Sequence, residues 1–358
     1  MDLEPAMRRA LELSAAVLGT TSPNPPVGAV ALDTDGVVVG EGATQPPGGP
    51  HAEVMALRQA GERARTVVVT LEPCDHTGRT GPCSEALLAA GVQRVVVGCA
   101  EPTAAAAGCV ARLRAAGVEV VSGVLEDEVA RGPLEGWLHR QRTGRPFVTW
   151  KYAATLDGRV AAADRSSRWI TGEAARADVH RLRGESDAVV VGVGTVLADD
   201  PQLNVRPHPG HQPLRVVVDS AGRTPAGARV LDDAGPTLVA TTNPRYDDPR
   251  ALLLPAAPDG RVDLGALLEA LAERDVVGVL LEGGPTLAGA FVAAGLVDRV
   301  VGYVAPALLG DGPAALAGTG VTTIGDAVRL RLDDVARVGD DVRLTLRPGP
   351  RPRSDRRE

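Results

Sequence analysis

Aromatic residues are scarce in this sequence, making up 2% of its 358 residues, and lysine occurs once, as Lys151. A core with so few aromatic rings must rely on Val, Leu and Ala. Arginine supplies the other basic side chains, so the single lysine stands out. It follows the apolar run 146–150, a place that favours a role in a functional site over chance survival at the surface.

Cysteine is also rare, with four in the whole chain. So few thiols do not make a disulfide-stapled secreted domain and fit a reducing compartment, so we expect a cytoplasmic protein. Cys99 and Cys109 have no partner at a metal-ligand spacing, and we expect both to be small buried hydrophobic residues. Cys74 and Cys83 each follow a proline and belong to a larger motif.

The chain lacks a long apolar run and an excess of basic residues. No stretch is long enough to span a bilayer, and acidic residues near the start do not fit a signal peptide. The net charge of −7 argues against a nucleic-acid-binding surface. A hydrophobic content of 44% and a charged content of 23% are typical of a globular protein, and the length suffices for two domains. We therefore expect neither a membrane nor a nucleic acid as partner.

The first motif with chemical content is His-x-Glu, formed by His51 and Glu53, followed by two Pro-Cys steps that end at Cys74 and Cys83. One imidazole and two thiolates can hold a zinc ion and leave its fourth position for water. Zinc lowers the pKa of that water, and a glutamate at this spacing can move its protons without ligating the metal. A purely structural interpretation, with a helix-start histidine and two buried cysteines, explains neither proline. The motif predicts a zinc-dependent deaminase with Glu53 as its catalytic acid and base.

Eight residues separate Cys74 from Cys83, where the general deaminase pattern has two. A loop of this length leaves the metal and returns to it, so we expect it to form part of the pocket rim. It carries His76 and Arg79, both able to meet an anion, and an arginine can bind a phosphate with two parallel hydrogen bonds. The spacing therefore indicates a phosphorylated substrate.

The stretch HAEVMAL…EPCDHTGRTGPCSEAL resembles the deaminase half of the bifunctional deaminase–reductase family of riboflavin biosynthesis. The segment 23–28 matches the N-terminal substrate loop of that family. The resemblance implies a cytidine-deaminase-like three-layer α/β sandwich. It also implies that Asn24, His76 and Arg79 bind the substrate.

Apolar runs alternate with helical periodicity along the whole chain, which predicts two α/β domains. The expected elements of the first domain are an amphipathic helix near the start, a hairpin at 27–32 and 37–40, helices at 51–60, 83–90, 111–116 and 126–142, and strands at 66–71, 94–98 and 118–121. In the second, we expect strands at 147–152, 188–193, 215–218, 237–241, 276–281 and 299–304, and loops at 199–213 and 243–258. We assign 1–143 to the deaminase domain, 144–347 to the second domain and 348–358 to a disordered tail.

The second domain carries two glycine-rich turns, at 192–195 and 283–286, each between an apolar run and a helical stretch. Such turns can seat a phosphate at a helix N-terminus, although spacing alone is equally compatible with ordinary tight turns. Neither turn has the three spaced glycines of the dinucleotide fingerprint, so a Rossmann domain is not expected.

The motifs KYAATLDGR, SSRWIT, GVGTVLADDPQLNVR and LLEGGPTLAGAF resemble the reductase half of the same family. The resemblance implies a dihydrofolate-reductase-like α/β domain that uses NADPH. The residues that it implies for the cofactor are Ala153, Trp169, Thr195, Asp199, Gly284, Pro285, Thr286, Leu287, Ala288, Gly289 and Ala290. Those that it implies for the substrate are Ser167, Arg183, Leu203, Arg206 and Glu282. Lys151 lies beside this pocket, where a cation can polarise the carbon that receives hydride, so we predict a catalytic role for it.

The combined resemblance predicts two consecutive reactions. The first is zinc-dependent hydrolytic deamination of 2,5-diamino-6-(5-phosphoribosylamino)pyrimidin-4-one, and the second is NADPH-dependent reduction of its ribosyl group to ribityl phosphate. On charge alone, Arg183 and Arg206 are candidate phosphate clamps. The resemblance also favours a homo-oligomer, either a dimer or a larger assembly.

At three positions that the resemblance places near the substrate, the first domain departs from the family pattern. Thr44 stands where a histidine is usual, and the run Glu-Pro-Thr-Ala at 101–104 stands in place of Asp-Pro-Asn-Pro, so that Glu101 replaces the Asp and Thr103 the Asn. Two alternatives therefore stay open: a zinc deaminase of another base fused to a reductase of altered substrate, and a non-catalytic zinc-stabilised descendant. The eight-residue loop and the reductase motifs argue against the first, and the intact zinc motif argues against the second.

Overall fold

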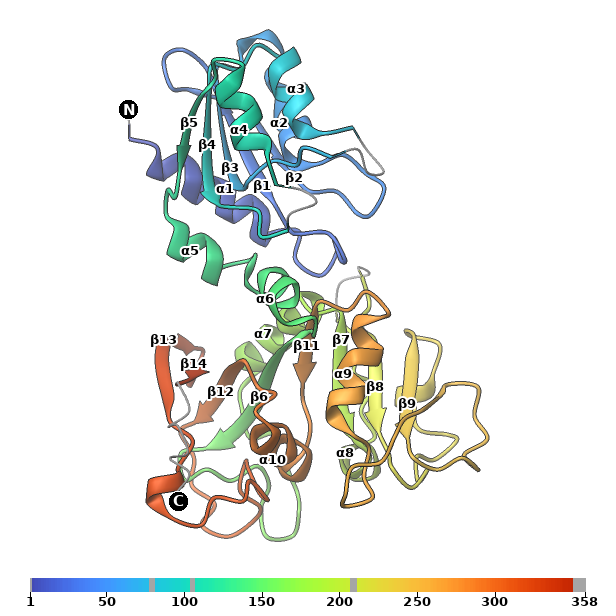
Figure 1. Cartoon of the computed structure of the whole chain (residues 1–358). Coiled ribbons are helices and arrows are strands. Elements are labelled where there is room, and N and C mark those ends of the chain that lie inside the picture. Colours follow the sequence, from blue (N-terminus) through green and yellow to red (C-terminus); the bar gives the residue numbers. More distant parts are fainter. Residues whose placement is uncertain (1, 77–80, 104–106, 207–210, 350–358) are drawn as a thin grey trace, which may run out of the picture. The chain divides into compact units, whose positions relative to one another are not determined.

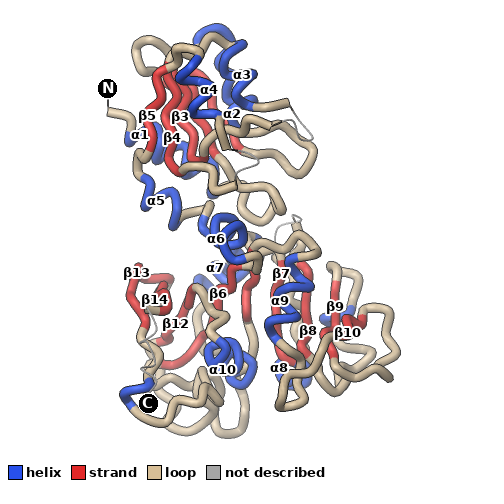
Figure 2. Tube along the Cα trace, in the orientation of Figure 1, coloured by secondary structure: helices blue, strands red, loops and turns tan. Residues whose placement is uncertain are grey.

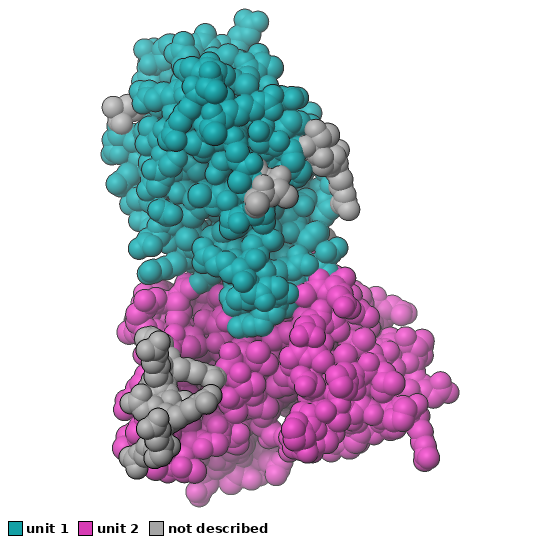
Figure 3. Space-filling view, in the orientation of Figure 1, with its two compact units in different colours: residues 1–146, 275–277 teal, residues 147–274, 278–358 magenta. Residues whose placement is uncertain are grey.

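The computed structural model describes residues 2–76, 81–103, 107–206 and 211–349. The chain divides into two compact units (Figure 3). The first contains residues 1–146 and 275–277, and the second contains residues 147–274 and 278–358. The division at 146/147 lies close to the predicted boundary at 143/144, whereas the assignment of 275–277 to the first unit was not expected from the sequence.

The sheet of the first unit is built from β1 (Gly28–Leu32), β2 (Val38–Ala43), β3 (Thr66–Leu71), β4 (Arg94–Cys99) and β5 (Glu119–Ser122). In space the strands follow the order β2-β1-β3-β4-β5 (Figure 1). β1 is antiparallel to β2 and β3, whereas β3, β4 and β5 are parallel. All residues of β1 and β3 are buried, which explains why both strands are unbroken apolar runs in the sequence.

Helices cover both faces of this sheet. A Cβ on Gly28 would lie 1.9 Å from a backbone oxygen of α1 (Glu4–Ala15), and one on Gly42 would lie 2.2 Å from a backbone oxygen of α2 (Ala52–Ala60). Gly42 is paired with Ala29, and Gly28 and Ala29 point to opposite faces because they are neighbours in one strand. α1 and α2 therefore lie on opposite sides, and the predicted deaminase-like three-layer arrangement is confirmed.

The other helices of this unit are α3 (Cys83–Ala89), α4 (Cys109–Ala115), α5 (Glu126–Arg131) and α6 (Glu135–Thr143). The single helix predicted at 126–142 is wrong, because the structure has two helices there. Gly132 ends α5 with φ −87° and ψ −138°. Pro133 follows it, and a proline disfavours the helical conformation of the residue before it and provides no N–H donor.

The sheet of the second unit is built from β6 (Phe147–Thr155), β7 (Ala188–Gly192), β8 (Leu214–Val218), β9 (Thr237–Thr241), β10 (Ala251–Leu253), β11 (Gly278–Leu281), β12 (Arg299–Ala305), β13 (Leu330–Val338) and β14 (Asp341–Pro348). The strand order is β10-β9-β8-β7-β11-β6-β12-β14-β13, and the strands from β10 to β12 are parallel. β13 and β14 form an antiparallel hairpin at one edge. The mixed α/β class expected for this domain is confirmed.

Three strands of this sheet were not predicted. β10 lies within the expected loop 243–258, which is therefore not wholly irregular. β13 contains four charged side chains among nine residues and is exposed over most of its length, so no buried apolar run marks it in the sequence. Pro348, expected to begin the tail, is the last residue of β14 and pairs with Leu330. The remainder of the predicted tail, apart from Gly349, lies outside the described residues.

The helices of the second unit are α7 (Glu173–Gly184), α8 (Val193–Asp199), α9 (Leu264–Ala272) and α10 (Pro285–Ala294) (Figure 2). α8 begins directly after β7, and α10 begins shortly after β11. Because β7 and β11 are parallel neighbours, the two glycine-rich turns meet at the same edge of the sheet. β11 also pairs with β6, with Leu281 opposite Trp150, so the next residues, Glu282 and Lys151, lie at neighbouring positions.

Candidate active sites

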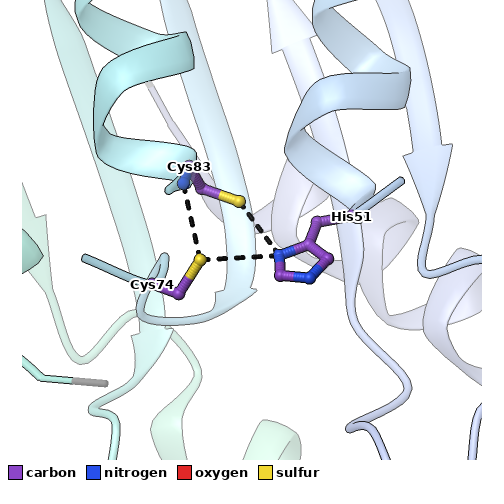
Figure 4. Close-up of side chains that lie close together, drawn as sticks. All are labelled: His51, Cys74 and Cys83. Carbon is purple, nitrogen blue, oxygen red and sulfur yellow. Dashed lines mark hydrogen bonds between the residues drawn. The ribbon is translucent and has the colours of Figure 1, made fainter. Parts of the chain in front are cut away.

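Three side chains of the zinc motif converge in the first unit (Figure 4). His51 immediately precedes α2, Cys74 follows β3, and Cys83 is the first residue of α3. The Nδ1 atom of His51 lies 3.2 Å from Sγ of Cys83 and 3.5 Å from Sγ of Cys74. Their potential ligand atoms all lie within 4.8 Å of one another.

The ends of two helices determine this geometry. His51 has an extended backbone, with φ −73° and ψ 161°, and the helix starts at the next residue. Pro82 likewise has an extended backbone, with φ −63° and ψ 137°, and α3 starts at the next residue. The backbone N–H of Cys83 then points at Sγ of Cys74, at 3.4 Å. Free N–H groups at a helix start favour a thiolate, and here the N–H of Cys83 favours the thiolate of Cys74.

The two sulfurs also influence the ionisation of each other. The hydrogen bond from the Cys83 side chain lowers the pKa of Cys74, and His51 acts in the same direction. That hydrogen bond, together with burial, raises the pKa of Cys83. A divalent cation among the three side chains would keep both sulfurs deprotonated. One nitrogen and two sulfurs form a donor set that zinc prefers, with one position left open, so the residues fit the metal.

Glu53 lies in the first turn of α2 and is 3% exposed. Burial raises the pKa of its carboxyl group. A carboxyl group whose pKa is closer to neutrality can both accept and return a proton, as an acid–base catalyst must. Glu53, His51 and Cys74 line one cavity of about 460 Å³.

The predicted substrate residues Asn24 and His76 also line this cavity. Arg79 lies outside the described residues. Trp137 and Gln141 of α6 contribute to the lining as well, and the sequence interpretation missed both. The sequence contains no local pattern for them, because they reach the cavity from a helix almost ninety residues after His51.

The three positions that depart from the family pattern all line the cavity. Thr44 Oγ1 accepts a hydrogen bond from the backbone N–H of Val27 at 3.1 Å. Glu101 Oε1 accepts hydrogen bonds from the backbone N–H of Thr103 at 2.9 Å and from its hydroxyl at 2.5 Å. These side chains therefore fix the conformation of the loops that form the cavity, and they also line it.

Charged side chains gather around Lys151 in the second unit. Burial lowers the pKa of Lys151, while the nearby Glu282 opposes this shift and Arg183 adds to it. Nε and Nη2 of Arg183 donate to the two carboxylate oxygens of Glu282, at 2.5 and 2.9 Å, and Nη1 donates to the carbonyl oxygen of Asn204 at 3.2 Å. The sequence interpretation named both Arg183 and Glu282 but did not predict that they pair.

His180 of α7 is a further member of this region that the sequence interpretation missed. Its Nδ1 accepts the backbone N–H of Arg206 at 3.2 Å. Leu203, three residues before Arg206, is 3% exposed and has φ 56°. Arg183 and His180 thus both bind the segment that contains the predicted substrate residues Leu203 and Arg206.

The two glycine-rich turns lie against each other. A Cβ on Gly284 would be 3.4 Å from Thr195 Oγ1, and one on Gly192 would be 3.6 Å from the Leu287 Cβ. The structure therefore brings together Thr195 of one turn with Gly284 and Leu287 of the other. Gly284 is also the residue that caps α10, whose first helical residue is Pro285.

The remaining predicted cofactor residues occupy different surroundings. Asp199 Oδ1 accepts a hydrogen bond from the hydroxyl of Ser167, a predicted substrate residue, at 3.4 Å. Trp169 is exposed, and the guanidinium carbon of Arg176 lies 4.5 Å from the centre of its ring. Ala288 and Gly289 are buried in α10, whereas Thr286 is exposed and Ala290 is partly buried. Ala153 of β6 is partly buried and packs against a cluster that includes Val179 of α7.

Family models match both units. The model of the cytidine and deoxycytidylate deaminase zinc-binding region matches residues 1–99, and that of the RibD C-terminal domain matches residues 146–344. The riboflavin biosynthesis protein RibD of Mycobacterium tuberculosis is 50% identical over 350 residues, which cover 96% of this chain and 97% of the relative. The chain belongs to the RibD family. The Escherichia coli RibD protein is 43% identical, over 95% of this chain and 98% of the relative.

Solved structures agree with this assignment. A deaminase/reductase of Thermotoga maritima superposes with a TM-score of 0.89 at 36% identity, covering 97% of this chain and 98% of the other. RibD of Acinetobacter baumannii gives 0.87 at 42% identity, covering 97% and 99%. RibD proteins are bifunctional deaminase–reductases of riboflavin biosynthesis, with a zinc-binding deaminase domain and a reductase domain that uses NADPH. The predicted family, activities and cofactors are confirmed.

No helix among the residues that the structure describes is long and apolar enough to cross a membrane.

Proposed function

We propose that this RibD-family chain acts twice on one phosphorylated pyrimidine, first removing an amino group and then reducing the ribosyl group to ribityl phosphate. The name of the Thermotoga maritima structure gives both reactions, on diaminohydroxyphosphoribosylaminopyrimidine and on 5-amino-6-(5-phosphoribosylamino)uracil. The observation that carries the proposal is the cluster of His51, Cys74 and Cys83 beside buried Glu53 at one cavity.

In the deaminase domain His51, Cys74 and Cys83 would hold zinc. The metal supplies Lewis acidity that lowers the pKa of water. Glu53 accepts a proton from the attacking water and delivers it to the pyrimidine, and the exocyclic amine then leaves as ammonia. One water is consumed, and a ring carbonyl replaces the amino group. Burial of Glu53 supports this role, because its raised pKa makes it a competent acid for the departing amine.

The cavity walls bind the rest of this substrate. Asn24 and His76 supply polar groups at the lining. From the sequence alone we assign to Arg79 the positive charge that a phosphate needs. The volume of about 460 Å³ falls in the range of small-molecule sites. We assign these three residues to substrate binding.

In the reductase domain Lys151 acts on the reacting carbon. NADPH supplies the hydride. The Lys151 side chain is partly buried among charged groups, where its ammonium stabilises negative charge that develops as the opened ribose is reduced. Thr195 and Gly284, which adjoin each other at two helix starts, suit the phosphates of the cofactor. We assign the other cofactor residues, Ala153, Trp169, Asp199 and 285–290, to the same ligand.

The ion pair of Arg183 with Glu282 decides which arginine we assign to the substrate phosphate. Its guanidinium is engaged by Glu282 and Asn204, so Arg183 orients Glu282 rather than meeting a phosphate alone. Arg206 is exposed and is the better phosphate clamp of the two. Ser167 and Leu203 complete the substrate set, with Glu282 available to the ribosyl hydroxyls.

We further assign the enzyme to the cytoplasm as a homo-oligomer. The zinc site needs Cys74 and Cys83 as thiolates, which a reducing compartment preserves. Edge strand β13 and its partner β14 carry exposed apolar side chains, with Leu332 53% and Val335 55% exposed, and a second copy can cover such an edge. Light scattering on the purified protein distinguishes a monomer from a dimer or larger assembly.

The function is tested by offering the purified zinc-loaded enzyme three substrates in parallel. These are the phosphorylated diaminopyrimidine, its dephosphorylated form and a free aminopyrimidine base. We expect rapid ammonia release from the first alone. Faster release from the free base would overturn the assigned substrate class and favour a deaminase of another base.

A further inference from the structure

Glu72 stands at the junction between the metal-binding loop and the central sheet. It follows β3, and its backbone N–H donates to the carbonyl oxygen of Cys99 at 2.8 Å, which extends the pairing of β3 with β4 by one step. It precedes Cys74 by two residues, and its side chain lines the deaminase cavity. A carboxylate at this place can either contact a ligand in the cavity or accept hydrogen bonds from the segments that form the cavity walls.

The hydrogen bonds of the Glu72 side chain join it to two distant segments. Oε2 accepts the backbone N–H of Glu101 at 3.3 Å, and Oε1 accepts the backbone N–H of Val110 at 3.2 Å. Val110 is the second residue of α4, where N–H groups have no partner within the helix. One carboxylate thus satisfies two backbone donors that lie 29 and 38 residues away in the chain.

The effect of Glu72 extends to a second layer of the wall. Glu101, whose N–H it binds, in turn accepts two hydrogen bonds from Thr103. Glu72, Glu101 and Thr103 all line the cavity that contains Glu53. Loss of the Glu72 carboxylate would leave two backbone donors without their acceptor and release the segment 101–103 from the loop between β3 and Cys74.

We propose that Glu72 is a positioning residue of the deaminase, which holds the 101–103 wall and the start of α4 in the conformation that binds substrate. This inference rests on the proposed deaminase function of the cavity and adds a determinant of substrate affinity to it. Glu72 acts through Glu101 and Thr103 and not on the reacting atoms. Its removal therefore weakens binding more than it slows chemistry.

The kinetic test compares Glu72→Ala with Glu72→Gln. For Glu72→Ala we expect the KM of deamination to rise about tenfold or more, as for loss of charged hydrogen bonds, with kcat changed much less. Glu72→Gln should fall between this variant and the wild type, because its amide oxygen can accept one of the two N–H groups. Zinc content and NADPH consumption with the deaminated substrate should stay at wild-type levels. Loss of zinc, or a fall in kcat at unchanged KM, would overturn the proposal.

A second readout is independent of the substrate. Hydrogen–deuterium exchange of peptides that cover 101–103 and 107–115 should accelerate in Glu72→Ala and in Glu72→Gln, while exchange over β1 stays unchanged. Thr103→Val acts on the same wall without touching Glu72, and its KM effect should be less than additive with that of Glu72→Gln. Unchanged exchange over both segments would overturn the inference, even where KM rises. Failure of wild-type deamination would instead count against the proposed function, because exchange still reports on Glu72.

Discussion

Arg183 and Glu282 form a bidentate ion pair, in which Nε and Nη2 of Arg183 lie 2.5 and 2.9 Å from the two carboxylate oxygens. Both side chains are largely buried, with 13% and 9% exposure. The pair neutralises two of the charges beside Lys151. The Lys151 ammonium, which lies beside this pair, is 6.0 Å from the centre of the Tyr303 ring.

Replacement of Lys151 by alanine should lower reductase turnover about 100-fold, because a charge directed at a developing anion is lost. Deamination provides the control within the same chain and should be unaffected. The measurement is the rate of NADPH loss with the deaminated substrate at saturation. A wild-type rate of hydride transfer in this variant would show that Lys151 has no catalytic role.

The pH profile of the reductase gives a second test of the same residue. Burial lowers the pKa of Lys151 from its ordinary value of 10.5, and Glu282 opposes part of that shift. Because the ammonium is charged below its pKa and neutral above it, turnover should fall as the pH rises, with a midpoint below 10.5. Lys151→Arg, which stays protonated, should shift this loss to higher pH or remove it. An identical alkaline limb in the arginine variant would assign the titration to another group.

Replacement of Glu53 by glutamine should lower the deaminase kcat between about 100-fold and 10,000-fold, the range expected for loss of a general acid–base catalyst. The amide cannot accept or return the proton, but it keeps the shape of the side chain. Zinc content, measured by metal analysis, should match the wild type, as should NADPH consumption with the deaminated substrate. Undiminished ammonia release would exclude Glu53 as the catalytic base.

Removal of the metal should separate the two activities. A chelator, or the substitution Cys83→Ser, should abolish ammonia release, because the donor set then holds zinc weakly or not at all. The second unit contributes no residue to the cluster, so NADPH consumption with the deaminated substrate should continue. Re-addition of zinc should restore deamination in the chelated wild type only. Parallel loss of both activities would contradict a zinc role confined to the deaminase.

Asp178 should stabilise the second unit in a pH-dependent way. Burial works against its charged form, but hydrogen bonds from Arg181, Tyr303 and Arg343 prevail and lower its pKa below 3.8. A carboxyl group whose folded pKa is depressed stabilises the fold above its unfolded pKa, and this contribution is lost as the pH falls through the folded pKa. Asp178→Asn should therefore cost about 1–3 kcal/mol at pH 7 and progressively less below pH 3.8.

This loss is measured by the urea midpoint for reductase inactivation in wild type and variant, at pH 7 and under acidic conditions. The midpoint for deaminase inactivation serves as the internal reference. An equal stability difference at both pH values would show that the Asp178 charge is not the source of the effect.

Much of the fold follows from local patterns. The apolar runs of β3, β4 and β7 are unbroken because these strands are buried over nearly their whole length, and this burial is visible in the residue types. β13 escaped prediction because its side chains are mainly exposed and four of the nine are charged, so its position depends on pairing with β14. The split between α5 and α6 was overlooked although Pro133 indicates it directly.

The candidate sites, like the fold, were predictable only where the signal is local in the sequence. The zinc cluster was predictable because each ligand has a distinctive type and spacing, and both helix starts are encoded locally by His51 and Pro82. The hydrogen bonds from the backbone N–H groups of Glu101 and Val110 to Glu72 were not predictable, because almost every residue type provides a backbone N–H. Residue type likewise identified Arg183 as a cation but gave no information about its pairing with Glu282.

The most direct test of the account is a two-step assay with the phosphorylated diaminopyrimidine, in which ammonia and NADPH are followed together. Ammonia release should precede NADPH loss, and one NADPH should be consumed for each ammonia released. With Glu53→Gln, both signals should disappear from this substrate, and NADPH loss should return when the deaminated substrate is supplied. NADPH loss without ammonia release in that variant would contradict the order of the two reactions.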